Sequence, residues 1–468
     1  MTTDLSNPST TPPLPAPALL RMGLQGEVYL PTDPGWDDAR AAWNLAVDQR
    51  PHAVVVAAGA DDVAATIGYA AHHGLRVAPQ GTGHNAAPLG DLAGTVLLKT
   101  SGMRGVRIDP ERRVARVEAG VVWGEVTAAA AEHGLAALAG SAADVGVVGY
   151  CTGGGISWLA RKHGLACNSV LALDVVTADG SRRRIDADCD PDLFWALRGG
   201  GGSFAVVTAV EIALLPITHV HAGAMFWPVE RAGEVLHAYR RWTRDLPDEV
   251  TSCGRLLQLP PLPDLPEPLR GRAFVLVEAV VLGDQGQADA LLAPLRELGP
   301  EIDTSEMIPV QQLSALHMDP PGPVPGSGDG GLLAELPAEA VDALVAVAGA
   351  GSGSPLLSVE LRHLGGALAV APPGAGATAT LEAEFAWFAV GMTPDRVTQD
   401  KVARHLELLS DQLAPWDAGR AYLNFVERSS SPSRFHGADI LGRLAQVKRA
   451  YDPHDVVRAN HPVAPDAG

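Results

Sequence analysis

The chain has 468 residues, of which 47% are hydrophobic and 19% charged, and its formal net charge is −19. This length and composition predict a globular protein of about two domains and exclude wholesale disorder. The acidic balance excludes nucleic acid and anionic membrane surfaces as expected partners, because both repel negative charge.

Cysteine usage and the N-terminus indicate a compartment. The four cysteines form neither a CxxC pair nor a zinc-like spacing with histidines, so no metal centre and no disulfide framework is expected. The N-terminus lacks the basic start and apolar core of a secretory signal, and no run of about 18 apolar residues escapes charges and breakers. We therefore expect a cytoplasmic protein whose proline-rich residues 1–20 form a loose tail.

Short strands, hairpins and helices alternate from residue 50 to 216. A strand, an alanine-rich helix that ends at Gly74 and a second strand predict a βαβ unit. Two hairpins follow, one turning at residues 109–111 and one at 178–180, and a helix is expected directly after the glycine triplet 153–155. The predicted strands are 53–57, 75–78, 95–98, 105–108, 114–117 and 204–210, the second hairpin spans 171–185, and a further helix covers 122–133.

Beyond Pro216 the composition shifts, and a second α+β region is expected. Residues 259–271 and 319–331 consist largely of Pro, Gly, Ser and Asp in turn-like combinations, which predicts two surface loops. The expected helices are 232–245, 287–298, 337–347, 395–413 and a terminal helix ending at Tyr451; the expected strands are 273–281, 356–361, 382–390 and 421–426.

Three glycine-rich segments carry the chemical signals. In the first, Gly81-Thr82-Gly83-His84-Asn85 directly follows a strand, so its backbone N–H groups can approach a diphosphate closely. As a bare pattern it matches the dinucleotide fingerprint of a nicotinamide-binding fold. That fold requires a helix here, which Pro88 and Gly90 interrupt. A nicotinamide-dependent dehydrogenase is therefore disfavoured.

The other two segments are residues 140–155 and 197–204. Their small residues leave backbone donors bare and make room for a flat ligand, and a helix beginning after residue 155 would turn its positive end toward negative charge. Tight packing alone is a poor explanation for three such segments within about 120 residues.

These segments resemble the berberine-bridge-enzyme-like (BBE-like) flavin oxidases of the p-cresol methylhydroxylase and vanillyl-alcohol oxidase superfamily. The resemblance covers residues 50–216 and 422–465, and four stretches carry it: 79–85, 144–163, 190–204 and 451–465. It implies an α+β fold with a two-lobed PCMH-type FAD-binding domain and an α+β substrate domain on an antiparallel sheet. The implied division is a lead-in at 1–46, the FAD-binding domain at 47–216, the substrate domain at 217–418 and a segment completing the FAD-binding domain at 419–468.

The resemblance also implies the cofactor and its contacts. FAD is expected to bond covalently to His84, and the loop around it to bind the diphosphate. Relatives often add a second bond through a cysteine in Gly-x-Cys-Pro, but this chain reads Gly140-Ser141-Ala142-Ala143, so a single bond is expected. Cys151 does not match that position and is interpreted as buried filler. The expected cofactor-binding residues are His84, Gly81, Thr82, Gly83, Asn85, Ser141, Gly146, Gly149, Gly153, Gly154, Val206, Asn424 and Asn460.

Departures from the family pattern leave the catalytic base open. Relatives carry Tyr-x-Asn-Tyr near the C-terminus, whereas here Phe425 replaces the last tyrosine and cannot take a proton. Gln80 also stands where relatives often place arginine. Another group must act as base, or the substrate needs none; the base candidates are Tyr422, His363 and His317. Glu360 and Glu384 are weaker candidates on predicted strands, and Trp227, Phe385 and Trp387 indicate either a partly aromatic site or core packing.

The expected function is oxidation of a small organic substrate, an alcohol or an amine or an oxidative ring closure, with dioxygen as electron acceptor and a setting in secondary metabolism. The missing hydroxyl at Phe425 motivates one alternative, a redox-neutral or non-catalytic flavoprotein scaffold on the same fold.

Overall fold

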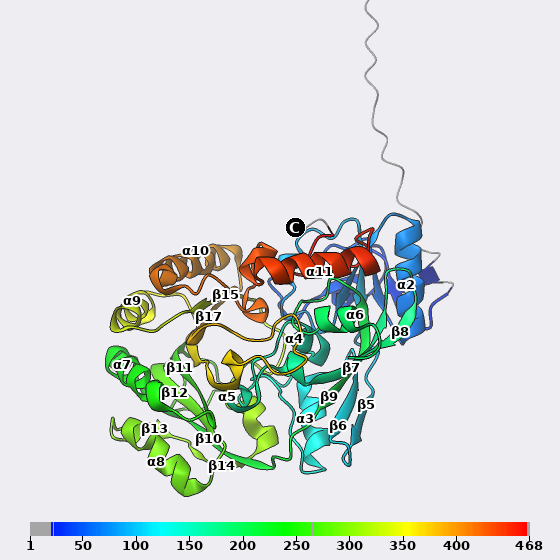
Figure 1. The fold of residues 1–468 in the computed structure, drawn as a ribbon. Coiled ribbons are helices and arrows are strands. Elements are labelled where there is room, and N and C mark those ends of the chain that lie inside the picture. Colours follow the sequence, from blue (N-terminus) through cyan, green and yellow to red (C-terminus); the bar gives the residue numbers. More distant parts are fainter. Residues whose placement is uncertain (1–19, 22, 264, 466–468) are drawn as a thin grey trace, which may run out of the picture.

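The structure is a computed structural model that describes residues 20–21, 23–263 and 265–465, so nearly all of the predicted N-terminal tail lies outside the described residues. Two sheets built from the first half of the chain lie on one side of the molecule, and a third sheet with its helices lies on the other (Figure 1). Within the described residues, no helix is both long and apolar enough to cross a membrane.

The first sheet has the strand order β1-β2-β4-β3. β2 and β3 both run parallel to β4, which lies between them, and β1 pairs antiparallel with β2. The helix α2 has two aspartates in its first turn and buries Val63 and Ile67 against the sheet. The predicted βαβ unit is therefore confirmed. Its elements are β1 (Glu27–Tyr29), α1 (Trp36–Arg40), β2 (Ala53–Val56), α2 (Ala60–His72), β3 (Arg76–Gln80) and β4 (Thr95–Lys99).

The second sheet is antiparallel, with the order β5-β6-β9-β7-β8. Both predicted hairpins are present in it, and the apolar strand β9 pairs with a strand of each hairpin. Its elements are β5 (Val106–Asp109), β6 (Val114–Glu118), α3 (Trp123–Ala131), α4 (Val147–Thr152), α5 (Ala160–His163), β7 (Val170–Val176), β8 (Arg182–Ile185), α6 (Pro191–Ala196) and β9 (Val206–Ala213).

The third sheet has the order β13-β10-β12-β11-β16-β17-β15, with β14 also paired to β10. Leu256, Val277 and Leu361 point to the face covered by α7, α8, α9 and α10. Alternate positions, Cys253 and Val280 among them, point to the opposite face and join the core of the second sheet. The elements are β10 (His219–Pro228), α7 (Ala232–Trp242), β11 (Val250–Gln258), β12 (Ala273–Val281), α8 (Gln285–Arg296), β13 (Ile302–Asp303), β14 (Glu306–Pro309), β15 (Gly326–Leu333), α9 (Ala338–Ala348), β16 (Ser358–His363), β17 (Phe385–Met392) and α10 (Arg396–Leu413).

The C-terminal segment crosses back to the first sheet. After α11 (Ala438–Tyr451), Val457 forms a parallel bridge with Val77 of β3. The buried Lys448 donates to the Ser203 and Val457 carbonyl oxygens and pairs with Asp452 at 2.6 Å. The segment after α11 therefore runs along β3 and reaches the loop that follows this strand, where Asn460 contacts Asn85.

Three predictions about elements are wrong. Residues 326–331, expected in a surface loop, form most of the buried strand β15, whose glycines accept aromatic rings from neighbouring segments. The helix expected after residue 155 begins only at Ala160, as the short α5, because the triplet takes positive φ angles at Gly154 and Gly155; the helix α4 before the triplet was not predicted. The strand expected at 421–426 is a single 3-10 turn at Leu423–Phe425. β10 and β11 were not predicted. The α+β class with an antiparallel sheet is confirmed.

Candidate active site

His84 lies in the loop that follows β3. Gly83 before it has φ of 87°, a left-handed conformation that favours glycine. The His84 ring stacks on Trp43, with centroids 4.0 Å apart and an interplanar angle of 18°. Its Nδ1 lies 2.7 Å from Thr82 Oγ1, and its Nε2 lies 3.5 Å from Asp144 Oδ1. The loop thus presents a histidine held on three sides.

The second glycine segment lies directly beside this loop. The α4 helix begins after Gly146, and a Cβ at Gly146 would lie 3.8 Å from Thr82 Cγ2. A Cβ at Gly149 would meet nothing within 4 Å, so open space adjoins this helix. The Tyr150 ring is wedged between two glycines, since a Cβ at Gly155 would come within 2.5 Å of it.

Residues of the C-terminal segment complete the cluster. Asn424 packs on Gly153, where a Cβ would lie 1.8 Å from the amide oxygen. Asn460 Nδ2 donates to the Asn85 carbonyl at 3.2 Å, and Asn85 Nδ2 donates to the Val426 carbonyl at 3.0 Å. These contacts join three predicted cofactor-binding segments that are far apart in the sequence.

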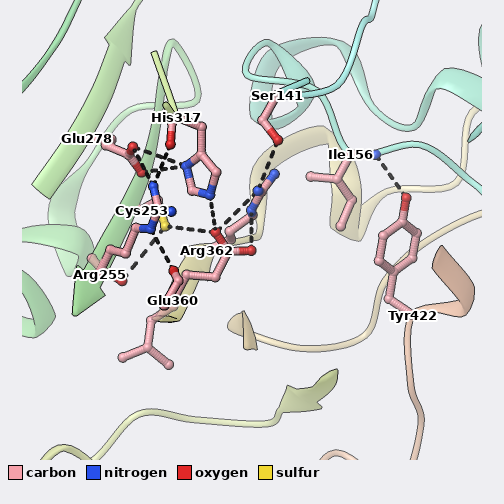
Figure 2. A network of polar contacts seen from close by, with 12 residues as sticks. Ser141, Ile156, Cys253, Arg255, Glu278, His317, Glu360, Arg362 and Tyr422 are labelled. Atoms are coloured by element: carbon pink, nitrogen blue, oxygen red, sulfur yellow. Dashed lines mark hydrogen bonds and ion pairs between the residues drawn. The ribbon is translucent and has the colours of Figure 1, made fainter. Parts of the chain in front are cut away.

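Tyr422 fixes the glycine triplet. Its buried hydroxyl oxygen accepts a hydrogen bond from the backbone N–H of Gly155 at 2.8 Å. It also accepts one from the backbone N–H of Ile156 at 3.1 Å (Figure 2). Asn424 Nδ2 donates to the same oxygen at 3.0 Å. Burial raises the pKa of this phenol above its ordinary value, so the hydroxyl is neutral at physiological pH.

Two predicted cofactor-binding residues lie apart from the His84 cluster. Ser141 contacts the third sheet, where its hydroxyl lies 3.4 Å from Arg362 Nη2. Val206, on β9, buries its side chain in the core cluster that lines the first sheet. Gly81 closely follows β3, and a Cβ there would lie 3.9 Å from the Thr100 hydroxyl.

The unpartnered polar atoms of this region test whether FAD fits. The Asn85 Oδ1 and Tyr150 Oη atoms are buried and have no hydrogen-bond partner within the described residues. Both lie in segments that the contacts above bring together, and Tyr150 directly follows Gly149, where a Cβ would meet open space. Buried polar atoms are normally satisfied, so these two indicate a ligand with polar edges. A flat dinucleotide cofactor meets this requirement.

A buried ionic network faces this region from the third sheet (Figure 2). His317 Nδ1 lies 2.8 Å from Glu278 of β12, and its Nε2 lies 2.8 Å from Glu360 of β16. Glu360 also pairs with Arg362 two residues on, at 3.0 Å. Arg255 of β11 donates to the His317 carbonyl at 2.6 Å.

The charged groups of this network fix one another's protonation states. Burial and Arg255 oppose protonation of His317, but the two carboxylates outweigh them and raise its pKa to about 9. Burial opposes ionisation of Glu360, yet Arg362 and His317 hold its pKa far below the ordinary value. His317 is therefore a cation and Glu360 an anion at neutral pH.

Arg362 connects the network to the glycine segments. Its guanidinium carbon lies 5.7 Å from the ring centroid of Trp158 and 5.2 Å from that of Phe425. The same guanidinium contacts Ser141, one residue before the position of the second family cysteine. Arg362 thus brings the ionic network of the third sheet into contact with the second glycine-rich segment and with Phe425.

Comparison with known proteins finds similarity to FAD-linked oxidoreductases. A family model described as "FAD binding domain" matches residues 51–186. The (R)-6-hydroxynicotine oxidase of Paenarthrobacter nicotinovorans is 36% identical over 207 residues, and an FAD-linked oxidoreductase of Bacillus subtilis is 26% identical over 456 residues, 97% of its length. The former alignment spans 44% of this chain and 45% of that oxidase.

Solved structures agree. The structure of 6-hydroxy-D-nicotine oxidase from Arthrobacter nicotinovorans matches with a TM-score of 0.82 and 26% identity, covering 95% of this chain and 98% of that one. A Physcomitrella patens BBE-like 1 variant matches with a TM-score of 0.84 at 19% identity over the same shares, a likeness of fold. The chain is thus similar in sequence and fold to FAD-linked oxidases of the PCMH/VAO flavoprotein family, and its residues 51–186 match an FAD binding domain.

The matched FAD binding domain and the FAD-linked relatives support FAD as the cofactor of an oxidoreductase. The three predicted base candidates lie in different surroundings. Tyr422 binds the glycine triplet, and His317 lies between two carboxylates. His363 lies on the helix-covered face of the third sheet, where burial and the nearby Arg161 lower its pKa to about 3.

The remaining residues singled out in the sequence lie at the surface or in hydrophobic cores. Glu384 is exposed to solvent, while Trp227, Phe385 and Trp387 pack in the core beneath the helices, so core packing rather than an aromatic site explains them. Cys151 is buried in the core of the second sheet, and the described residues contain no disulfide and no cluster suited to a metal.

Sequence reasoning missed several residues of the flavoprotein's site. Trp43 lies in the lead-in that precedes the family resemblance, and nothing in the sequence pattern indicates its stacking on His84. Asp144 opens a recognised motif, but its contact with His84 depends on the tertiary fold. Arg362 lies outside the stretches that carry the family resemblance, and its place beside them follows from the register of β16 with β11.

Proposed function

We propose that the protein is an FAD-dependent oxidase that takes hydride from a small organic substrate, holds FAD through a single covalent bond to His84, and is reoxidised by dioxygen. Bound FAD supplies the electron acceptor for the hydride. The observation that carries the proposal is the convergence of His84, the glycine triplet and Asn424 on one region with unpartnered polar atoms.

The single bond follows from the residue at the second attachment position. Ala142 has no nucleophile, and Ser141 beside it is engaged with Arg362. Cys151 is buried, and burial raises the pKa of its thiol well above the ordinary value, which suppresses the reactive thiolate.

We further propose that the chain divides into its parts at residues 46, 216 and 418, that the protein is cytoplasmic, and that it acts in secondary metabolism.

The surroundings of the titratable groups favour an amine substrate. Alcohol oxidation requires a base that removes the hydroxyl proton as hydride leaves. Tyr422 is a neutral phenol that already accepts three hydrogen bonds, and His317 is already protonated. A neutral amine needs no such base, because its nitrogen lone pair stabilises the positive charge that hydride loss creates. Proton removal by the protein is then unnecessary.

The alternative is a redox-neutral or non-catalytic flavoprotein. Phe425, which lacks the family hydroxyl, motivates it, and its ring lies against Tyr422 with centroids 4.9 Å apart. Amine oxidation does not require the missing hydroxyl, so Phe425 is compatible with catalysis. Substrate-dependent release of peroxide separates the two functions.

The experiment begins with acid denaturation of the purified protein and an intact-mass measurement. We expect yellow colour in the pellet and a mass increase of one FAD, both lost in His84→Ala but retained in the control His133→Ala, whose histidine is exposed. Flavin that stays attached in His84→Ala would contradict the attachment site.

Substrate class is tested on the wild-type protein by peroxide release from matched pairs of small amines and alcohols. We expect turnover of amines, with rates that rise as the amine loses its proton, and little turnover of the alcohols. Comparable alcohol turnover would refute the amine assignment and leave the oxidase intact. No peroxide from any member of a broad panel would favour the scaffold.

A further inference from the structure

Three side chains from separate parts of the chain surround His84. Trp43 covers one face of the ring, Thr82 contacts Nδ1, and Asp144 approaches Nε2. Trp43 Nε1 also donates to Asp144 Oδ2 at 2.5 Å, so the residue that stacks on the histidine fixes the carboxylate as well. The contacts therefore fix the orientation of the His84 ring and place a polar group beside each of its nitrogens. Both features would affect the proposed covalent bond to FAD.

The charge of Asp144 determines which nitrogen of His84 carries the proton. Burial opposes ionisation of Asp144, but its contacts with His84 and Trp43 outweigh burial and hold its pKa below the ordinary value. A carboxylate attracts an N–H group and repels a nitrogen lone pair. The neutral ring is therefore expected to carry its proton on Nε2, which lies 3.5 Å from Asp144 Oδ1 and has no hydrogen-bond partner within the described residues. Its lone pair is then on Nδ1, 2.7 Å from Thr82 Oγ1.

We propose that Asp144, fixed by Trp43, is a positioning residue that prepares His84 Nδ1 as the nucleophile for covalent attachment of FAD. The inference rests on the proposed attachment at His84 and goes beyond it. The logic is that of a carboxylate that orients a catalytic histidine, which sets the tautomer and stabilises the imidazolium as it forms.

A bond forms between His84 Nδ1 and the 8α methyl carbon, one C–H bond of that methyl breaks, and the Nε2 proton passes to Asp144 and then to solvent. Two protons and two electrons leave in total, and dioxygen accepts them as hydrogen peroxide. Asp144 contributes by offsetting the positive charge on the ring while the Nε2 proton is still bound.

The test uses the full-length chain produced under riboflavin limitation, with FAD added and the covalent fraction followed by intact mass. Asp144→Asn keeps the shape and the acceptor for Trp43 but removes the charge. We expect it to lower the maximal linkage rate by roughly a hundredfold, less than the loss of about 10⁴-fold known for Asp→Asn at an aspartate that orients a catalytic histidine, with little change in the FAD concentration at half-maximal rate. Asp38→Asn, the same change at an exposed position of α1, should link at the wild-type rate.

Each outcome decides something. Linkage by Asp144→Asn at the wild-type rate overturns the proposal. If that variant binds no FAD, Trp43→Phe decides, because it keeps an aromatic ring for stacking and removes the N–H donor to Asp144. A wild-type linkage rate in Trp43→Phe also overturns the proposal. A wild-type chain that binds FAD without any mass increase refutes the proposed covalent function instead, so the two failures are distinguishable.

The attached nitrogen is an independent readout that a merely structural role for Asp144 would not determine. A flavin-bearing peptide from the digested wild-type protein, studied by NMR, should carry the flavin on Nδ1. Attachment through Nε2 would contradict the tautomer that Asp144 is inferred to set.

Discussion

His317 is a buried cation held between carboxylates from two neighbouring strands. Glu278 and Glu360 each approach one ring nitrogen at 2.8 Å, and the ring is 4% exposed. Breaking one partner of such a cluster leaves an uncompensated buried charge. The network is therefore expected to stabilise the sheet face that adjoins the FAD region, and to do so only while His317 is protonated.

The raised pKa of His317 predicts a loss of stability at alkaline pH. Because the pKa is about 9 in the folded protein and near 6.5 in the unfolded chain, its contribution is complete below about pH 6.5 and disappears as the pH rises through 9. We expect the stability advantage of wild type over His317→Gln to shrink between pH 7 and 10 by on the order of 3 kcal/mol. Urea unfolding at each pH measures it, and a constant difference would contradict the prediction.

At the residue scale the sequence indicated His84 but not the residues that act on it. The glycines and the histidine form a contiguous motif, so their position after a strand was enough to predict a cofactor loop. Trp43 lies 41 positions upstream of His84, and Asp144 lies 60 downstream. Contacts between such positions depend on packing, which a single sequence does not contain.

The strand β15 is the element where sequence reasoning failed most clearly. Its glycines read as a loop, yet the strand pairs with β17 over its full length. The glycines are needed because aromatic groups lie against the strand: a Cβ would be 2.6 Å from the Trp387 indole nitrogen at Gly331 and 2.9 Å from Phe425 Cβ at Gly330. Glycines in a strand can mark a close approach by neighbouring groups that leave no room for a side chain, so glycine content alone does not predict a loop.

Adding a side chain to β15 should therefore destabilise the protein most at the glycines that neighbouring groups approach closely. Gly331→Ala would overpack the contact with Trp387 and should lower the free energy of unfolding by about 1–3 kcal/mol. Gly326→Ala, at the start of the same strand, meets nothing closer than 3.7 Å and is the matched control. Chemical denaturation compares the two variants, and equal losses would show that strand propensity rather than packing decides.

At the scale of the whole molecule, both ends of the chain are required to form one site. Trp43 comes from the N-terminal lead-in, His84 from the first sheet, and Asn460 from the segment after α11. Hydrophobic periodicity predicted most helices and the hairpins, because their patterns are local. The return of residues 452–460 to β3 was implied only by the family resemblance, since its stabilising contacts are ionic and buried.

Lys448 anchors this return, which leads to a prediction for the whole fold. Its ammonium group, with 0% of the side chain exposed, pairs with Asp452, whose carboxylate also accepts from the Val456 and Val457 N–H groups at 2.8 Å. Lys448→Met would leave Asp452 buried without its cation, so we expect a loss of about 3–5 kcal/mol in the free energy of unfolding.

The same substitution should loosen the segment that carries Asn460, because Asn460 reaches the Asn85 carbonyl only when residues 456–458 lie along β3. In a His84→Ala background, where FAD is held without the proposed bond, Lys448→Met should therefore also weaken FAD binding. Lys401→Met, at an exposed position of α10, is the control for both measurements. If Lys448→Met lowers stability but leaves FAD affinity equal to that of the control, the C-terminal segment supports the fold without shaping the cofactor site.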